Sequence, residues 1–383
     1  MDNYLLLGHR ILRDGRRRGD RTGTGTRSIR SATLIWDLRE GFPLMTTKSV
    51  NLKSVFHELA WILKGETNIQ YLVDNNCGFI WRPWSIAEDV IEETPLSNPD
   101  RLFWLRVNNP VAHAKWLESK IFAQPVAVGE AYLDQHEVPR VRTVVKVKAG
   151  ETNAPYGPNW RRWKGRNGEV IDQIAYMLNL LRTNPESRRI LLSAWDPANL
   201  PDESVSPQEN VKQGRPCLTP CHHLMEFYAD KLTTDERVLW LTTNNPFIWD
   251  KWVNTVKANE DEKLDLFLDA HDVPKYYLDL KWAQRSVDVA IGLPFNIASY
   301  GMLLLMFAKT LNMVPRELEF NGTNVHMYEN HIEKFEQQFS RSPRPLPTLA
   351  LNTKHDRVED YEWEDFELHG YEPHEFIKYE VSV

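Results

Sequence analysis

The chain has 383 residues, with 46 basic and 53 acidic side chains and a formal net charge of −7. This balance argues against a protein that coats nucleic acid, because such proteins carry a basic surplus. The 14 tryptophans stand beside 13 tyrosines and 15 phenylalanines, an aromatic content that excludes a disordered chain. The length allows one large domain with insertions or two to three smaller domains.

The cysteines and the apolar runs bear on the cellular compartment. Three cysteines, Cys77, Cys217 and Cys221, are too few for a disulfide scaffold. The apolar run at 5–7 is too short for a signal peptide, and the run at 302–308 falls far short of the roughly 20 residues that span a bilayer. We therefore expect a soluble protein of the cytoplasm that does not contact a membrane.

Apolar spacing predicts helices and strands in alternation along the chain. Helical periodicity covers 52–63, where Gly65 ends it, and 171–181, where 183–185 ends it. Strands are expected at 190–195, 224–228 and 286–291, and a buried helix, apolar on all sides, at 297–312. The mixture predicts an α+β fold.

An internal repeat interrupts this pattern. Residues 101–110 reappear at 237–246, and residues 132–139 reappear at 267–274, at offsets of 136 and 135. Each copy is predicted to form a strand, an Asn-Asn-Pro turn, a helix and a strand that begins at Val-Pro. A unit of about 45 residues holds little core of its own, so each copy is expected to pack on the main domain or on its twin.

Arginines and glycines outside the repeat suit an anion. Residues 21–26, Arg-Thr-Gly-Thr-Gly-Thr, form a loop whose amides could approach an oxyanion, or simply a flexible turn. Arg188, Arg189 and Arg285 stand at the ends of predicted strands, where a guanidinium could hold a phosphate or remain a solvated surface group.

Cys221 begins a predicted strand beside His222 and His223. It could be a nucleophile with a lowered pKa, or an inert buried thiol. With Cys217, these residues could also form a zinc site, although His222 and His223 would point to opposite sides of a strand. His57-Glu58 is half of a metalloprotease motif, but Trp61 stands where the second histidine would be.

Taken together, these segments resemble the thymidylate synthase family. The segments that carry the resemblance are 21–26, 41–48, 57–61, 65–68, 186–189, 220–222, 284–288, 292–300 and 326–328. They occur in the family's order and cover the chain outside about 86–150 and 230–280. The resemblance implies one catalytic domain over 1–383, a three-layer α+β domain with a large mixed sheet, carrying two related small α/β insertions at 86–150 and 230–280.

The resemblance also implies roles for individual residues. The implied catalytic residues are Cys221 as the nucleophile, Glu58, Tyr156, Asp288 and Arg285. The implied substrate-binding residues are Arg21, Arg188, Arg189, His222, Gln284, Arg285, Ser286, Asn296, His326 and Tyr328. The implied cofactor-binding residues are Lys48, Ile80, Trp81, Trp84, Leu218, Asp288, Gly292, Phe295 and Val381. The co-substrate would be 5,10-methylenetetrahydrofolate, with no metal. Arg188 and Arg189 would reach the nucleotide of a partner subunit in a homodimer.

Two questions concern the reaction itself. The resemblance implies that Asn296 pairs with O4 and N3 of uracil, since an amide both donates and accepts hydrogen bonds, whereas the cytosine-specific members carry aspartate at this place. Asn296 therefore favours dUMP over dCMP. The product depends on whether a hydride or water completes the one-carbon unit. In this family a C-terminal tail closes over the folate, and here it contains Glu375, Glu380 and Ser382, which add polarity to a lid that excludes water.

Other departures from the synthase pattern are Asn51, Asn324-Val325 and Glu226. On these grounds we favour a deoxyuridylate hydroxymethyltransferase of viral type, which would act in the host cytoplasm. A thymidylate synthase is the alternative. A third hypothesis is a catalytically vestigial scaffold that recruits nucleotide enzymes through the insertions. Nucleic acid is not an expected partner, and Arg16-Arg17-Arg18 is interpreted as a solvated face near the substrate phosphate.

Overall fold

The computed structural model describes residues 1–20, 23–120, 132–255 and 261–381. Its centre is a seven-stranded sheet in the order β1-β2-β11-β9-β8-β7, in which β10 also pairs with β11. The strands are β1 (Arg16–Arg18), β2 (Thr26–Asp37), β7 (Leu191–Ser193), β8 (His222–Lys231), β9 (Tyr276–Gln284), β10 (Val287–Asp288) and β11 (Val314–Tyr328). Because β11 runs parallel to β9 and antiparallel to β2, the sheet is mixed, as predicted.

Side-chain alternation gives this sheet two different faces. One row across β7, β8, β9 and β11 consists of Leu192, Met225, Trp282 and Phe320, all buried. The adjacent row consists of Leu191, Glu226, Lys281, Glu319 and Ile35, and both of its apolar members are exposed. The first face therefore carries the core.

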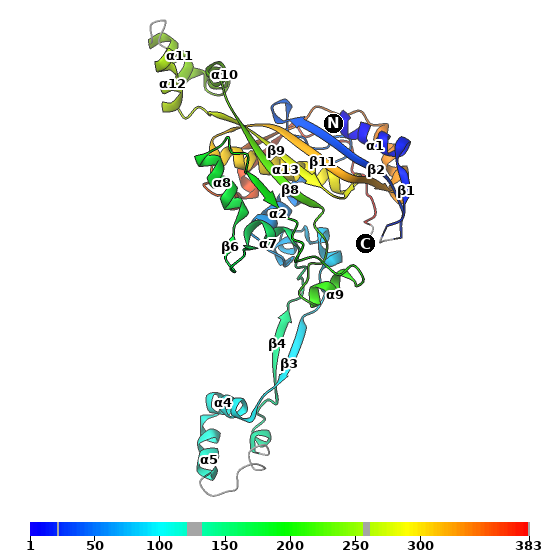
Figure 1. The fold of residues 1–383 in the computed structure, drawn as a ribbon, viewed down its shortest axis with the longest axis vertical. Coiled ribbons are helices and arrows are strands. Elements are labelled where there is room, and N and C mark those ends of the chain that lie inside the picture. Colours follow the sequence, from blue (N-terminus) through cyan, green and yellow to red (C-terminus); the bar gives the residue numbers. More distant parts are fainter. Residues whose placement is uncertain (21–22, 121–131, 256–260, 382–383) are drawn as a thin grey trace.

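Helix α13 (Gly292–Leu311) packs on that inner face (Figure 1). The other helices of the main body are α1 (Asp2–Asp14), α2 (Leu52–Leu63), α3 (Gln70–Asp74), α7 (Tyr156–Arg161), α8 (Gln173–Thr183), α9 (Pro207–Lys212) and α14 (Ile332–Phe339). The short 3-10 turns are η1 (Leu38–Glu40), η2 (Gly78–Ile80), η3 (Arg82–Trp84), η4 (Glu329–His331), η5 (Val358–Asp360) and η6 (Trp363–Asp365). Helix α13 packs on the sheet through ring pairs such as Phe307 with Phe227, with centroids 4.4 Å apart.

The predicted helices are confirmed in α2, α8 and α13. Helix α13 begins five residues earlier than predicted because Pro294 lies in its first turn, where a missing N–H costs nothing. Strands β7 and β8 lie where strands were expected. The strand expected at 286–291 is reduced to β10, because the Asp288 carboxylate accepts a hydrogen bond from the Ala290 amide and turns the chain.

Two small two-stranded sheets complete the main body: β5 (Trp163–Lys164) with β6 (Val170–Ile171), and β12 (Thr348–Leu351) with β13 (Phe366–His369). Among the described residues, no helix combines the length and the apolar character that crossing a membrane requires.

The repeated segments are helical where a strand was predicted. The first copy contains α4 (Asn98–Asn108) and α5 (Pro110–Lys120), and the second contains α10 (Thr234–Asn244), α11 (Pro246–Thr255) and α12 (Asp261–Ala270). The prediction was wrong because Ser97 and Thr233 cap the first helix of each copy, the latter in a full capping box. The Val-Pro-led strands are present, as β4 (Val141–Val147), which pairs with β3 (Val90–Pro95), and as β9.

Each copy has a small core of its own. Leu105 and Leu133 are buried in the first, and Leu241 and Leu268 are buried in the second, both apart from the main core. Figure 1 shows α4 and α5 beyond the far end of the β3–β4 ribbon, and α10 to α12 at the opposite end of the molecule. Among the described residues the two copies do not pack on each other, and the core of each is separate from the main core. The second copy meets the main body at its base, where Asn312 Nδ2 donates to the Asp272 carbonyl at 2.8 Å.

Candidate active site

Cys221 lies directly before β8, where three elements meet. Its backbone amide donates to the hydroxyl of Tyr156 in α7 at 2.9 Å. Its carbonyl accepts from the Arg285 amide, which follows β9, at 2.9 Å. The Arg285 guanidinium donates to the carbonyls of Pro220 (2.8 Å) and Thr219 (3.0 Å) and lies over the Trp195 ring. The cysteine is thus fixed between a phenol and a guanidinium.

The pKa of the Cys221 thiol depends on its burial and on the neighbouring charge of Arg285. Burial raises the pKa of Cys221 above its ordinary value, and the positive charge of Arg285 only partly opposes this. Of the two alternatives that the sequence left open, this direction disfavours a lowered pKa, so the thiol must lose its proton before the sulfur can act as a nucleophile. Cys217, four residues earlier, is buried and its pKa is raised to about 12, which is typical of an inert thiol.

His222 is held as a neutral ring. It stacks on Tyr156 with centroids 3.9 Å apart, and its Nδ1 lies 2.8 Å from the Tyr300 hydroxyl. Burial, with a smaller effect of His223, lowers the pKa of His222 to about 3. A ring that stays neutral at ordinary pH offers hydrogen bonds and packing rather than charge.

The Glu58 carboxylate is linked to the Cys221 pocket through two aromatic residues, Trp81 and Tyr156. It accepts a hydrogen bond of 2.8 Å from the indole of Trp81, whose ring lies 6.1 Å from that of Tyr156. Burial raises the pKa of Glu58 to about 7, although the Trp81 bond works against the rise. A carboxyl with this pKa is populated in both protonation states near neutrality, as a general acid or base requires.

The side-chain amides of Gln284 and Asn296 are held in one orientation, because the Trp282 indole can only donate a hydrogen bond. The Trp282 indole, which can only donate, bonds Gln284 Oε1 at 2.9 Å. Gln284 Nε2 therefore faces Asn296, and it donates to Asn296 Oδ1 at 3.1 Å. The Asn296 amino group has no hydrogen-bond acceptor among the described residues, so this relay directs it toward a ligand carbonyl.

A further set of polar side chains gathers where β10, β11 and β2 lie side by side. Asp288 pairs in register with His326, and His326 with Ser28. His326 Nδ1 lies 2.8 Å from the Asn324 carbonyl, so Nδ1 carries the proton and Nε2 can accept from a hydroxyl. Burial works to raise the pKa of Asp288, but His331, His326 and the Ala290 amide outweigh it and the pKa is lowered.

The C-terminal tail closes one side of this region. Glu380 contributes its carbonyl to His331 Nε2 at 2.7 Å, and the Tyr379 hydroxyl donates to Gln338 at 3.2 Å. The ring of Tyr379 covers the ammonium of Lys48 at 4.7 Å. Burial lowers the pKa of Lys48 to about 8, and its ammonium bonds the carbonyl of Ala290.

Comparison with known proteins agrees with this geometry. The sequence model of the family described as Thymidylate synthase matches residues 2–383. Two curated relatives are the thymidylate synthases of Francisella philomiragia subsp. philomiragia, 34% identical, and of Francisella tularensis subsp. holarctica, 35% identical. Each alignment spans 383 residues and covers the whole of both chains. The chain belongs to the thymidylate synthase family. Members of this family bind dUMP and a folate and transfer a one-carbon unit to C5 of the pyrimidine.

Most residues to which the resemblance gives a role lie in this one region. Contacts link Glu58, Trp81, Tyr156, Cys221, His222 and Arg285, and separately Gln284 with Asn296. Gly292 lies beside Asn296 and Asp288, and Ile80, Trp84, Leu218 and Phe295 pack on the main core. Ser286 and Tyr328 are half-buried.

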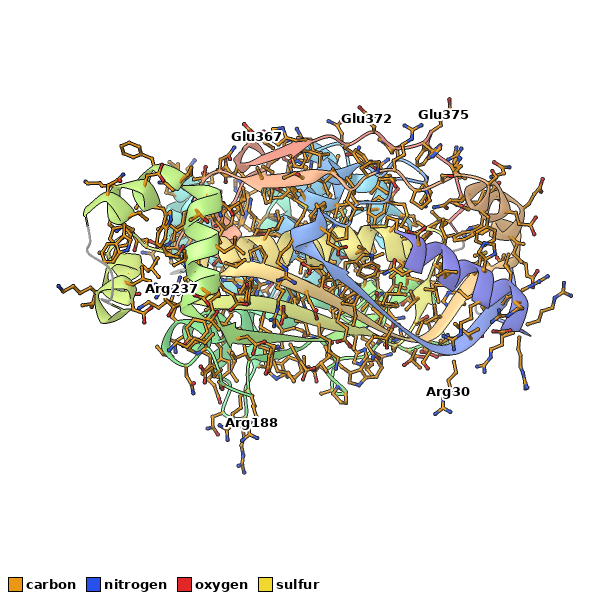
Figure 2. The ribbon with its side chains drawn as sticks, turned by 90° about the horizontal axis from the view of Figure 1, so that it is seen from above. Arg30, Arg188, Arg237, Glu367, Glu372 and Glu375 are labelled. Atoms are coloured by element: carbon orange, nitrogen blue, oxygen red, sulfur yellow. The ribbon has the colours of Figure 1, made fainter. Side chains whose placement is uncertain are left out.

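Other predicted residues lie elsewhere or outside the described residues. Arg21 and Ser382 fall outside the described residues. Val381 is 54% exposed, so the structure does not bury it in the region described here. Arg188 and Arg189 are exposed, and Figure 2 shows Arg188 projecting away from the body. The sequence analysis did not identify Tyr300, His331, Gln338 and Tyr379, because nothing in the local sequence links them to the pocket.

The residues present suit a folate and give no sign of a metal. The indole N–H of Trp84 is buried without a partner among the described residues, which suits a ligand acceptor. Asp288 and Lys48 supply opposite charges nearby, linked through Tyr379 and His331. Among the described residues, no group of three or more His, Cys, Asp or Glu side chains could hold a metal ion.

Proposed function

We propose that the protein is a thymidylate synthase that converts dUMP and 5,10-methylenetetrahydrofolate to dTMP and dihydrofolate. The observation that carries this proposal is the orientation of the tail. Ile377 and Tyr379 are buried, whereas Glu375, Lys378 and Glu380 are exposed. Figure 2 shows Glu375 on the outer surface. Ile377 and Tyr379 give the tail an apolar inner surface that excludes water from the pocket, while Phe376 and Val381 are exposed.

This orientation removes the main reason for favouring hydroxymethyl transfer. That reasoning placed the carboxylates of Glu375 and Glu380 where they would admit water, and both point outward. Only the backbone carbonyl of Glu380 is turned inward, and His331 satisfies it. The third polar residue, Ser382, lies outside the described residues.

The other departures also have local explanations. Asn51 is the N-cap of α2 and accepts from the Ser54 amide at 3.1 Å. Asn324 has a φ of 49°, in the left-handed region that asparagine tolerates better than most residues. Glu226 lies on the outer sheet face, 3.6 Å from Lys281. None of these roles concerns water in the pocket.

The pocket residues then divide the chemistry as follows. The Cys221 sulfur adds to C6 of the pyrimidine, and the electron pair moves toward O4, where the Asn296 amino group donates a hydrogen bond. C5 becomes nucleophilic and would form the new C–C bond to the one-carbon unit, and the C–N bond that joins this unit to the folate would break as the C5 proton is lost. Glu58, with its pKa near 7, exchanges protons with water at the base, and Tyr156 assists loss of the C5 proton. The folate supplies the one-carbon unit and, in the methyl-forming branch, the hydride. Departure of Cys221 from C6 restores the ring.

The same amide relay supports dUMP as the substrate. Because Gln284 donates to Asn296 Oδ1, the Asn296 amino group is directed toward the ligand, where it suits the O4 carbonyl of uracil. The 4-amino group of cytosine would place two donors against each other.

We also propose a homodimer. The outer sheet face exposes Ile35, Leu191 and Tyr228, and residue pairing places them on the same side of the sheet. In Figure 2, Arg188 projects from the side opposite Glu367 and Glu372. A second copy covering this face would bury these side chains and bring Arg188 and Arg189 to the phosphate in the partner's pocket.

The two helical units are proposed to be insertions in a single catalytic domain. Their separate cores and their positions at opposite ends of the molecule support this division. The intact set around Cys221 speaks against a vestigial scaffold.

The test is to incubate the protein with dUMP and methylenetetrahydrofolate, to weigh the nucleotide and to follow dihydrofolate by absorbance. A nucleotide heavier by CH₂, formed with one equivalent of dihydrofolate, is expected. A gain of CH₂O with tetrahydrofolate as the other product would identify a hydroxymethyltransferase instead. Cys221→Ala should form neither product, and turnover by this variant would refute the shared mechanism.

A further inference from the structure

The first 30 residues carry far more positive charge than the rest of the chain. They contain eight arginines and three aspartates, a net charge of +5, in a protein whose total is −7. Arg10, Arg13, Arg16, Arg17 and Arg18 are all exposed, at the end of α1 and in β1. All three arginines of β1 are exposed, so this strand contributes little to the hydrophobic core. Packing therefore does not explain why the strand carries three positive charges.

Sheet register places part of this charge beside the active site. Arg16 pairs with Ser28 and Ser28 with His326, while Arg18 pairs with Thr26 and Thr26 with Tyr328. Directly paired residues point to the same face, so Arg16 and Arg18 share a face with His326 and Tyr328, two of the implied substrate-binding residues. The separation is two strand spacings, about 10 Å between backbones. Figure 1 shows β1 at the edge of the sheet, and all three of its arginines are exposed.

The side chains of Arg16 and Arg18 have no partner within the part of the chain that the structure describes. Arg17, whose side chain points to the other face, lies 3.2 Å from Glu329, and Arg13 pairs with Asp14. Among the described residues, the guanidinium groups of Arg16 and Arg18 have neither a hydrogen bond nor an ion pair. Their charges are therefore available to an approaching anion.

We propose that Arg16 and Arg18 form a steering surface that draws the nucleotide's phosphate dianion toward the pocket, without contacting the bound nucleotide. The inference rests on the proposed function, because it takes dUMP as the ligand. A phosphate monoester carries close to two negative charges at neutral pH. At about 10 Å, the attraction acts within the Debye length at low and moderate salt, which is about 30 Å at 0.01 M and about 10 Å at 0.1 M. An otherwise acidic molecule gains most from such a local field, because its remaining surface repels the ligand.

The test is the rate of dUMP association, followed by stopped-flow tryptophan fluorescence in the full-length protein. The variant is Arg16→Gln/Arg18→Gln. The matched control is Arg106→Gln/Arg142→Gln, which removes the same charge from exposed arginines of the first repeat unit, at the far end of the molecule. Steering predicts an association rate lowered on the order of 10-fold at 0.01 M salt for the first variant only. The gap should close near 1 M salt, where the Debye length is about 3 Å. Dissociation and kcat should be unchanged.

Several outcomes would overturn the inference. An unchanged association rate, an equal loss in the control, or a loss that persists at 1 M salt would each refute steering. Deoxyuridine, which lacks the phosphate, should bind the variant and the wild type at equal rates, and an equal loss for it would also refute the idea. If the variant loses only binding to a single-stranded oligonucleotide, the surface serves nucleic acid instead. Failure of the wild type to bind dUMP at all would refute the proposed function itself.

Discussion

Replacing Glu58 with glutamine should stabilise the protein at alkaline pH while abolishing turnover. Glu58 lies half-buried on α2, with one hydrogen bond from Trp81. Burial raises its pKa from an ordinary value of 4.5 to about 7. A shift of about 2.5 units corresponds to roughly 3 kcal/mol of cost for the charged form in the folded protein. Because the side chain keeps some contact with water, about 1–3 kcal/mol is expected.

The direction of the pH dependence follows from the proton balance. Between pH 4.5 and 7 the folded protein keeps the Glu58 proton, whereas the unfolded chain loses it. The unfolded state thus binds fewer protons, so this group makes unfolding easier as pH rises through that window. The neutral glutamine can still accept the Trp81 hydrogen bond and carries no such cost. The gain from Glu58→Gln should therefore be small at pH 4.5 and complete above pH 7.

Chemical denaturation at pH 4.5, 6 and 8 would measure this gain. The control is Glu375→Gln, which removes one carboxylate from the exposed side of the tail. The readout is the difference in the free energy of unfolding between variant and wild type, compared across pH. A gain that is equal at all three values, or absent at pH 8, would refute the reasoning that burial of a charge sets the pKa of Glu58.

Three further predictions concern the pocket. Alkylation of Cys221 by iodoacetamide, followed by mass spectrometry, should have its midpoint above pH 9.0, because burial raises the pKa of the thiol; a midpoint near neutrality would contradict this. Tyr379→Ala should raise the KM for the folate several-fold and increase the hydroxymethylated fraction of product, because it removes the ring over Lys48 and the bond to Gln338. Asn296→Asp should shift kcat/KM from dUMP toward dCMP by at least about 10-fold, since a carboxylate accepts from a 4-amino group, and unchanged preference would refute the role of the amide relay.

The amphipathic helices were the part of the fold that sequence pattern predicted well. In α8, Ile174, Met177, Leu178 and Leu181 are buried as their spacing indicated. By contrast, the sequence analysis did not identify β2 and β11, the two longest strands. These strands pair with each other across about 300 residues of sequence, for example Tyr328 with Thr26, and a short stretch of sequence gives no sign of such a distant partner.

The repeat units show how capping outweighs composition. Residues 101–107 are rich in apolar and aromatic side chains, and this suggested a strand. The structure forms α4 because Ser97 caps the helix, and Arg101 and Leu105 fall one turn apart on its buried side. Arg101 then bonds Asp134 at 2.6 Å, as Arg237 bonds Asp269 at 2.6 Å in the second copy. The capping residues stand just outside the repeated segments, where the comparison of the copies did not reach.

For the site, motif resemblance identified the residues that stand in family motifs. It missed residues that hold those motif residues in place from other elements. Tyr156, Cys221 and His222 stand in recognisable motifs and meet in the structure. Tyr300 of α13 supports His222, and His331 of η4 holds the Glu380 carbonyl of the tail, so the contribution of both depends on how distant elements pack. The pKa of Cys221 could not be predicted either, because it reflects the balance between burial and a single guanidinium.

The C-terminal tail shows that the number of polar residues in a segment does not indicate whether that segment keeps water out of the pocket. Its side chains alternate, with Ile377 and Tyr379 buried and Phe376, Lys378 and Glu380 exposed. Glu380 lies on the outward phase of this alternation, and Glu375 precedes the alternating stretch and is also exposed. Neither carboxylate therefore adds polarity to the inner surface of the tail. The choice between methyl and hydroxymethyl product should therefore respond to the inward side chains, Tyr379 and Trp81, and remain insensitive to charge removal at Glu375 and Glu380.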